Sequence, residues 1–77
     1  MQVDVRQLDN LKFSIHARQH TVICDQPTEN GGFDEGMTPP ELLLASLGSC
    51  AAFYAVQYLK TRSLSSGAVE VSVHAEK

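Results

Sequence analysis

The fold is decided by residues 31–50, which read GGFDEGMTPPELLLASLGSC. In this stretch Pro39 directly follows Thr38, and Glu41 stands three residues after the threonine. The Thr-x-x-Glu spacing is typical of a capping box, in which each side chain pairs with a backbone N–H group that the start of a helix leaves unpaired. Proline suits the first helical position, where its missing N–H group costs nothing. We therefore predict a helix that begins directly after Thr38.

The predicted helix is long and apolar. Residues 42–59 contain no charged side chain, and Lys60 and Arg62 then supply positive charges that suit the C-terminal end of a helix dipole. About 23 helical residues at 1.5 Å each give a length of roughly 35 Å. A helix that is apolar on nearly every side is typically buried, so we predict burial on most of its faces. A membrane span is the competing interpretation, which Ser46, Ser49 and Gln57 argue against.

The segments around this helix have the alternation of strands. Residues 2–8, 11–18 and 21–25 predict three short strands, and in the second of these the apolar side chains fall on one face. A glycine-rich loop at 26–37 leads to the helix, and residues 68–76 alternate valine with polar residues, which predicts a fourth strand. We expect an α+β fold, with an antiparallel strand meander, a long buried helix and a further strand, as a single domain over residues 1–77.

Composition excludes several classes of function. Seventy-seven residues with a net charge of −3 and no basic cluster do not predict a nucleic-acid-binding protein. Two cysteines do not form a disulfide framework, and without a signal peptide we expect a reducing, cytoplasmic location. The spacing of the cysteines and of His16, His20 and His74 matches no zinc site, so no metal and no cofactor are expected.

Cys50 falls in the middle of the predicted helix, beside its short polar stripe. One interpretation is a packed core cysteine, since free cysteine is among the most buried residue types. The other is a reactive thiolate, which in mid-helix needs a cation from another element, and Arg18 is the nearest candidate. Cys24 ends a strand beside Asp25, and a Cys24–Cys50 disulfide stays open because spacing does not give geometry.

The run from Gly31 to Cys50 closely resembles the central segment of the OsmC/Ohr family of osmotically inducible and organic-hydroperoxide-resistance proteins. That family has a glycine-rich loop followed by Ser/Thr/Asn-Pro-x-Glu-Leu-Leu-x-Ala-x-x-x-x-Cys on a long helix. The predicted strands also follow the family order, so the chain resembles the N-terminal half of an OsmC-like protein. The resemblance implies an intertwined homodimer with the strands around the helix.

The resemblance also implies a chemistry. In peroxidase members the helix cysteine attacks a hydroperoxide and becomes a sulfenic acid, a later cysteine forms a disulfide with it, and an arginine and a glutamate assist. Cys50 matches the attacking cysteine, and the later cysteine has no counterpart. Glu41 stands nine positions before Cys50, where the best-characterised peroxidases have their glutamate at ten, and Arg18 is the candidate arginine.

Two functions follow as hypotheses. The first is an OsmC-like thiol peroxidase with Cys50 as the peroxidatic cysteine and Arg18 and Glu41 as assisting residues, acting on a small-molecule organic hydroperoxide. The alternative is a dimeric binding or structural module without catalysis, in which Cys50 packs or lies beside an apolar ligand. Both require a homodimer, because the large side chains around the helix are too many for one small sheet to cover. No membrane partner is expected.

Overall fold

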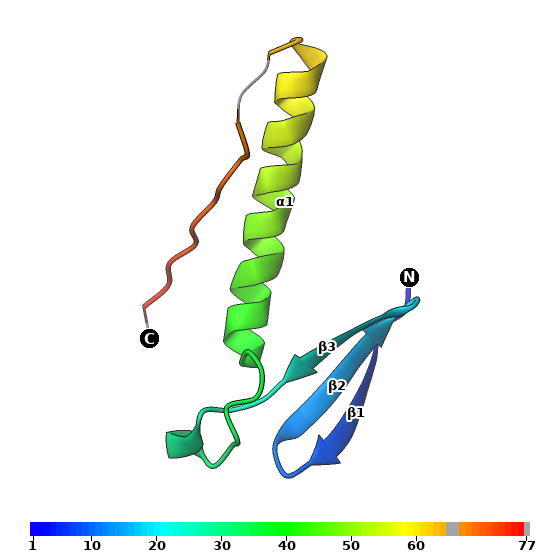
Figure 1. Cartoon of the computed structure of the whole chain (residues 1–77), viewed down its shortest axis with the longest axis vertical. Coiled ribbons are helices and arrows are strands. Elements are labelled where there is room, and N and C mark those ends of the chain that lie inside the picture. The colour runs from blue at the N-terminus through cyan, green and yellow to red at the C-terminus, as the bar shows by residue number, and fades with distance from the viewer. Residues whose placement is uncertain (65–66, 77) are drawn as a thin grey trace. The chain divides into compact units, whose positions relative to one another are not determined.

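The computed structural model of the chain describes residues 1–64 and 67–76. Along the chain the elements are strands β1 (Asp4–Asp9), β2 (Lys12–Ala17) and β3 (His20–Cys24), a short 3-10 helix η1 (Thr28–Asn30) and helix α1 (Pro39–Thr61) (Figure 1). The chain divides into two compact units, Met1–Glu41 and Leu42–Lys77.

The first unit contains a three-stranded antiparallel sheet in the order β1-β2-β3, which confirms the predicted meander. Ile15 of β2 pairs with Val5 on one side and with Val22 on the other. Residues directly opposite in an antiparallel pair share a face, so these three form an apolar row across the sheet. The neighbouring row of Asp4, His16 and Thr21 lies on the other face. The sheet therefore has one apolar and one polar face.

Arg18 does not lie on the polar face of a strand, as the alternation suggested. Strand β2 ends at Ala17, and Arg18 occupies the tight turn into β3 with a left-handed backbone (φ 57°). Its side chain is exposed. A two-residue connection between antiparallel strands requires positive φ angles, and this turn geometry takes Arg18 out of the strand.

The start of α1 confirms the predicted capping box. The backbone N–H of Thr38 donates to Glu41 Oε1 at 2.9 Å, and the backbone N–H of Glu41 donates to Thr38 Oγ1 at 3.4 Å. The helix begins at Pro39 and ends at Thr61, a length of 23 residues, also as predicted.

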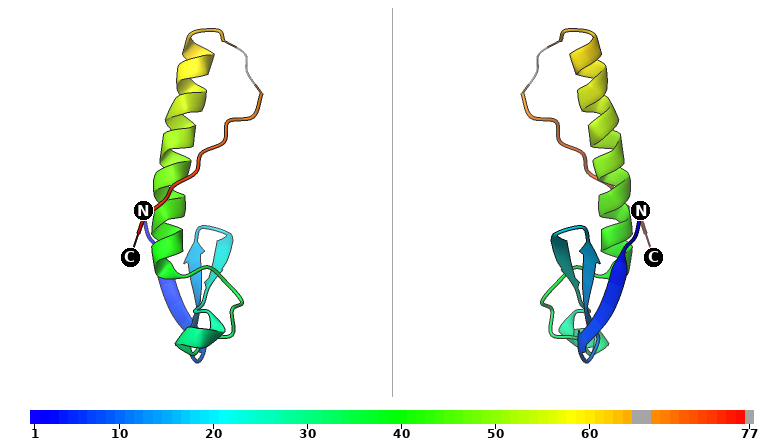
Figure 2. Two further views of the ribbon diagram at one scale, coloured as in Figure 1. Left: turned by 90° about the vertical axis from the view of Figure 1, so that its left-hand side faces the viewer. Right: turned by 90° about the vertical axis from the view of Figure 1, so that its right-hand side faces the viewer.

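The predicted burial of α1 is wrong for the chain by itself. Gly48 is the one described residue of α1 that is buried, and large side chains are exposed along the helix. In the second unit, residues 67–76 run back along α1 and cover part of it (Figure 2). A Cβ atom added at Gly48 would lie 3.0 Å from Val73 Cγ2 and 3.9 Å from Val71 Cγ1. One extended segment covers one face of a helix and leaves the others open.

The predicted fourth strand is also wrong. Residues 68–76 form no strand, and among the described residues no strand pairs with them. Alternating valines favour an extended backbone, but a strand exists only where a second strand accepts its hydrogen bonds. Here Val71 and Val73 use their side chains to pack on Gly48 instead.

By length and composition alone, α1 is also able to cross a membrane. Core helices of soluble proteins meet the same criterion, although only 6% of the apolar window in α1 is buried. Helix length and composition therefore do not decide between a membrane and a protein partner.

Candidate functional site

Cys50 lies in the middle of α1 with a free and exposed thiol. The side chains one turn away are Ser46 and Leu47 on one side and Phe53 and Tyr54 on the other, and Leu47 and Tyr54 are 56% and 70% exposed. Tyr54 also makes an edge-to-face contact with Phe53, with ring centroids 5.3 Å apart. The thiol therefore lies between exposed apolar and aromatic side chains and the short polar stripe of Ser46 and Gln57.

Cys50 and Gly48 lie on opposite sides of the helix. A separation of two positions in a helix of 3.6 residues per turn places their side chains about 160° apart around the axis. The segment with Val71 and Val73 covers the Gly48 side. The Cys50 side is consequently the face that the second unit leaves uncovered.

The Cys50 thiol has no charged partner among residues 1–64 and 67–76. Within the described residues, no hydrogen bond, ion pair or ring contact involves Cys50. Arg62, near the end of the helix, lies over the ring of Tyr58 at 4.9 Å from the centroid. The carboxylate of Glu41 accepts hydrogen bonds from Thr38, and Arg18 belongs to the other unit. The structure thus places Glu41 in the helix cap and does not place Arg18 relative to the thiol.

Cys24 has a different environment from Cys50. It is free and 5% exposed, at the end of β3, where its backbone bridges to Met37. A buried thiol is poorly accessible to peroxide or reductant.

Asp25 is the residue that sequence reasoning missed. Its side chain is completely buried and accepts three backbone hydrogen bonds. Oδ1 accepts the Gln26 N–H at 2.7 Å, and Oδ2 accepts the N–H groups of Phe33 and Glu35, each at 3.2 Å. The Asp25 amide in turn donates to the Met37 carbonyl at 3.1 Å. The glycine-rich loop is therefore wrapped around one carboxylate.

Two glycines allow the loop to close on Asp25. A Cβ atom at Gly32 would overlap the Gln26 carbonyl oxygen and lie 2.8 Å from Asp25 Oδ1. A Cβ atom at Gly36 would overlap the carbonyl oxygen of Ile23. Residues 26–37 thus form a tightly packed loop with exposed acidic side chains. The glycine and acidic residues in the sequence did not predict this close packing.

The charges around the loop keep Asp25 ionised. Burial raises the pKa of Asp25, but the three amide hydrogen bonds and the nearby positive charge of Lys12 outweigh it, so the pKa lies below its ordinary 3.8. Lys12 Nζ lies 2.8 Å from Glu35 Oε1, and this hydrogen bond raises the pKa of Lys12 above its ordinary 10.5. Amide N–H groups bind both oxygens of Asp25, so the carboxylate acts as a structural acceptor that holds the loop.

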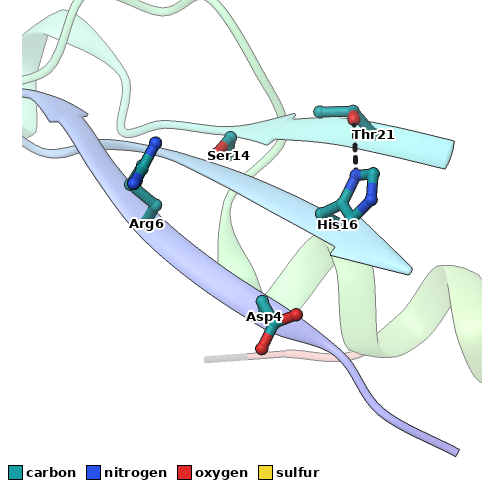
Figure 3. A pocket seen from close by; sticks show the side chains of 5 residues that line it. All are labelled: Asp4, Arg6, Ser14, His16 and Thr21. Atoms are coloured by element: carbon teal, nitrogen blue, oxygen red, sulfur yellow. Dashed lines mark hydrogen bonds between the residues drawn. The ribbon is translucent and has the colours of Figure 1, made fainter. Parts of the chain in front are cut away.

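The polar face of the sheet carries a second feature, an open hollow of about 350 Å³. Side chains from all three strands line it: Asp4, Arg6, Ser14, His16 and Thr21 (Figure 3). His16 Nδ1 lies 3.1 Å from Thr21 Oγ1. His16 is exposed, as expected, and among the described residues no group of three or more His, Cys, Asp or Glu side chains is placed to hold a metal ion. The hollow is a solvated surface.

The glycine-rich loop, the capping box and the exposed Cys50 in mid-helix lie within one continuous stretch, residues 31–50. The family model described as OsmC-like protein matches residues 32–77, more than half of the chain. The chain therefore belongs to the OsmC-like family. The match includes the capping box and Cys50, whereas the three strands precede it. No curated protein matches the chain, and no solved structure matches it.

Proposed function

We propose that this OsmC-like chain reduces organic hydroperoxides with the thiol of Cys50. The observation that carries the proposal is the free, exposed thiol on the apolar face of α1, inside the family-matched residues. Leu47 and Tyr54 offer apolar contacts beside the sulfur, which suit the hydrocarbon part of an organic hydroperoxide.

The proposed reaction begins with attack of the Cys50 thiolate on the terminal oxygen of the hydroperoxide. The new S–O bond forms as the O–O bond breaks, and the electron pair leaves on the alkoxide, which takes a proton and becomes the alcohol. Cys50 is oxidised to a sulfenic acid and the peroxide is reduced by two electrons. A dithiol reductant then attacks the sulfenic sulfur: an S–S bond forms, the S–O bond breaks, and the hydroxide takes a proton to become water. The second thiol of the reductant attacks its own sulfur in this mixed disulfide, so the reductant leaves as a disulfide and Cys50 returns to the thiol.

The assisting residues of the proposal are Arg18 and Glu41. A thiolate in mid-helix has no help from the helix N-terminus, so it needs a nearby positive charge. The proposal assigns this role to Arg18, whose exposed guanidinium takes part in no ion pair with a described residue. Glu41 would fix the start of the Cys50 helix through its bonds to Thr38, and would orient the arginine if the two meet.

The proposal includes an intertwined homodimer. Leu43, Leu47 and Tyr58 are each more than half exposed on α1. Fully burying one such side chain contributes roughly 1.5–3 kcal/mol, and a small domain has a net stability of only about 5–15 kcal/mol. Pairing about a two-fold axis covers the same face of both helices at once.

A non-catalytic module is the alternative function. It is favoured by the Cys50 thiol, which forms no hydrogen bond or ion pair with a described residue. In this alternative the dimer buries Cys50 as a packing residue or beside a bound apolar ligand. The thiol would then react with an alkylating agent only after denaturation.

The test is consumption of cumene hydroperoxide in the presence of a dithiol reductant. Wild type and Cys50→Ser are compared, with Cys24→Ala as the matched control because Cys24 is buried. We expect turnover for wild type and Cys24→Ala, and only the background rate for Cys50→Ser. Equal rates for wild type and Cys50→Ser would refute the peroxidase and leave the non-catalytic module.

A further inference from the structure

We propose that the hollow on the polar face of the sheet binds a phosphate group, with Arg6, Ser14 and His16 as the hydrogen-bond donors. All the residues that line the hollow belong to the first unit, Met1–Glu41. The proposed peroxidase uses the Cys50 thiol, which is not among them. The phosphate site is therefore a second function, and its test does not depend on peroxide turnover.

The hollow is built by all three strands of the sheet. Its volume of about 350 Å³ falls within the roughly 300–1,000 Å³ of small-molecule sites. Strand β1 supplies Asp4 and Arg6, β2 supplies Ser14 and His16, and β3 supplies Thr21 (Figure 3). Every lining side chain is polar or charged. A ligand here replaces water with hydrogen bonds, so the hollow suits a hydrophilic ligand.

The strand register brings the three donors around one point. Arg6 lies directly opposite Ser14 in the antiparallel pair of β1 and β2. His16 is two residues along β2 from Ser14, so it lies on the same face and diagonally across from Arg6. Diagonal neighbours are about 7–8 Å apart, which long side chains span. One anion above Ser14 therefore lies within reach of both the guanidinium and the imidazole.

The positive charge of Arg6 is unpaired in the part of the chain that the structure describes. Lys12 is paired with Glu35 at 2.8 Å, whereas Arg6 takes part in no ion pair with a described residue. Asp4, the acidic member of the hollow, accepts hydrogen bonds from Gln2 Nε2 at 3.1 and 3.3 Å. The guanidinium is thus free to donate its planar fork of N–H groups to two oxygens of a phosphate.

The imidazole of His16 is held by Thr21. Its Nδ1 lies 3.1 Å from Thr21 Oγ1 (Figure 3). An anion beside Nε2 favours the two forms of the ring that carry a proton there. These are the neutral ring whose Nδ1 accepts the Thr21 hydroxyl proton, and the charged ring whose Nδ1–H donates to that oxygen. Both forms keep the bond to Thr21, so the ring binds the anion without turning.

The donor set favours phosphate over a carboxylate ligand. A carboxylate has two oxygens, which the fork of Arg6 alone satisfies. A phosphate ester presents three strong acceptor oxygens, so it also accepts hydrogen bonds from Ser14 and His16. The carboxylate of Asp4 lies directly opposite His16 and repels an anion. It accepts hydrogen bonds from hydroxyl groups, however, so it suits the organic part of a small phosphate ester.

The test is an NMR titration of the full chain with inorganic phosphate and with glycerol 3-phosphate, followed at the amides of residues 14 and 16 and the ring protons of His16. Ionic strength is held constant, because salt screens exposed charges. We expect saturable shifts with both probes. A lower Kd for glycerol 3-phosphate supports a phosphate ester as the ligand, and equal Kd values support binding of the phosphate group alone.

Variants with opposite expected effects sharpen the test. Arg6→Gln removes the fork and should raise the Kd roughly tenfold or more. Asp4→Asn removes a like charge from the hollow and should lower the Kd by about threefold. Arg62→Gln is the matched control, because it removes the same charge from a residue outside the hollow and should leave the Kd unchanged. All three side chains are exposed, and circular dichroism checks that each variant folds.

Three outcomes would overturn the phosphate site. Shifts that grow linearly with phosphate concentration show that the hollow has no site. An Arg62→Gln variant that weakens binding as much as Arg6→Gln shows a response to net charge only. Weaker phosphate binding by Asp4→Asn contradicts the placement of the anion beside that carboxylate. None of these outcomes bears on peroxide turnover by Cys50.

Discussion

Replacing Gly32 by alanine should open the loop around Asp25. The new Cβ atom would overlap the Gln26 carbonyl oxygen and lie 2.8 Å from Asp25 Oδ1. The overlapped oxygen belongs to the backbone, so no side-chain rotation relieves the contact. The loop must therefore move away from residues 25–26.

The cost follows from the bonds that this movement breaks. The N–H of Asp34 donates to the Gln26 carbonyl at 2.9 Å, and the N–H of Gly32 donates to the Pro27 carbonyl at 3.1 Å. Each bond contributes about 1 kcal/mol net, and overpacking adds about 1–3 kcal/mol. We expect a loss of about 3–5 kcal/mol, which at about 4–8 °C per kcal/mol lowers the Tm by at least 12 °C.

The assay is thermal unfolding followed by circular dichroism, together with hydrogen exchange at the Asp34 amide. Gly67→Ala is the matched control, because an added Cβ there meets nothing within 4 Å. We expect Gly67→Ala to change the Tm by only a few degrees and Gly32→Ala to lower it and expose the Asp34 amide. A Gly32→Ala protein with the Tm of Gly67→Ala would refute the packing argument.

Three further predictions concern other contacts. Thr38→Ala should cost about 1 kcal/mol in urea unfolding, because it removes the cap of α1; an unchanged midpoint would contradict the cap. The lowered pKa of Asp25 means that its ionised form stabilises the fold above the ordinary value of 3.8, and that this stability is lost as the pH falls through the lower folded pKa. Acid unfolding of wild type should show this loss, and Asp25→Asn should lack it. Gly48→Leu should displace Val73 at a cost of about 1–3 kcal/mol, which protease cleavage within residues 68–76 would report; unchanged cleavage would argue against the contact.

The parts of the fold that the sequence predicted are those set by neighbouring residues. The capping box joins Thr38 to Glu41, three residues away, and the alternation in β2 lies within six residues. Such patterns depend only on residues a few positions apart, so they do not change with how the rest of the chain packs. The helix bounds and the strand meander were accordingly confirmed.

The parts that could not be predicted depend on distant partners. Asp25 binds amides eight and ten residues later, and no spacing rule connects an aspartate to backbone donors across a loop. The valines of residues 68–76 have the pattern of a strand, but that pattern does not say whether a sheet edge is available to them. The role of Cys50 is likewise open in the sequence, since burial or exposure of a helix face depends on what covers it.

The difference between the two sides of α1 explains why the burial predicted from its composition was wrong. Small residues on the Gly48 side let an extended segment of the same unit approach closely, and Val73 lies there. The side chains of Leu47, Tyr54 and Tyr58 lie on the Cys50 side and are each more than half exposed. The chain itself therefore covers the Gly48 side of α1, and the side with Leu47 and Tyr54 is exposed. The thiol lies on that open side, so whatever covers α1 also controls access to Cys50.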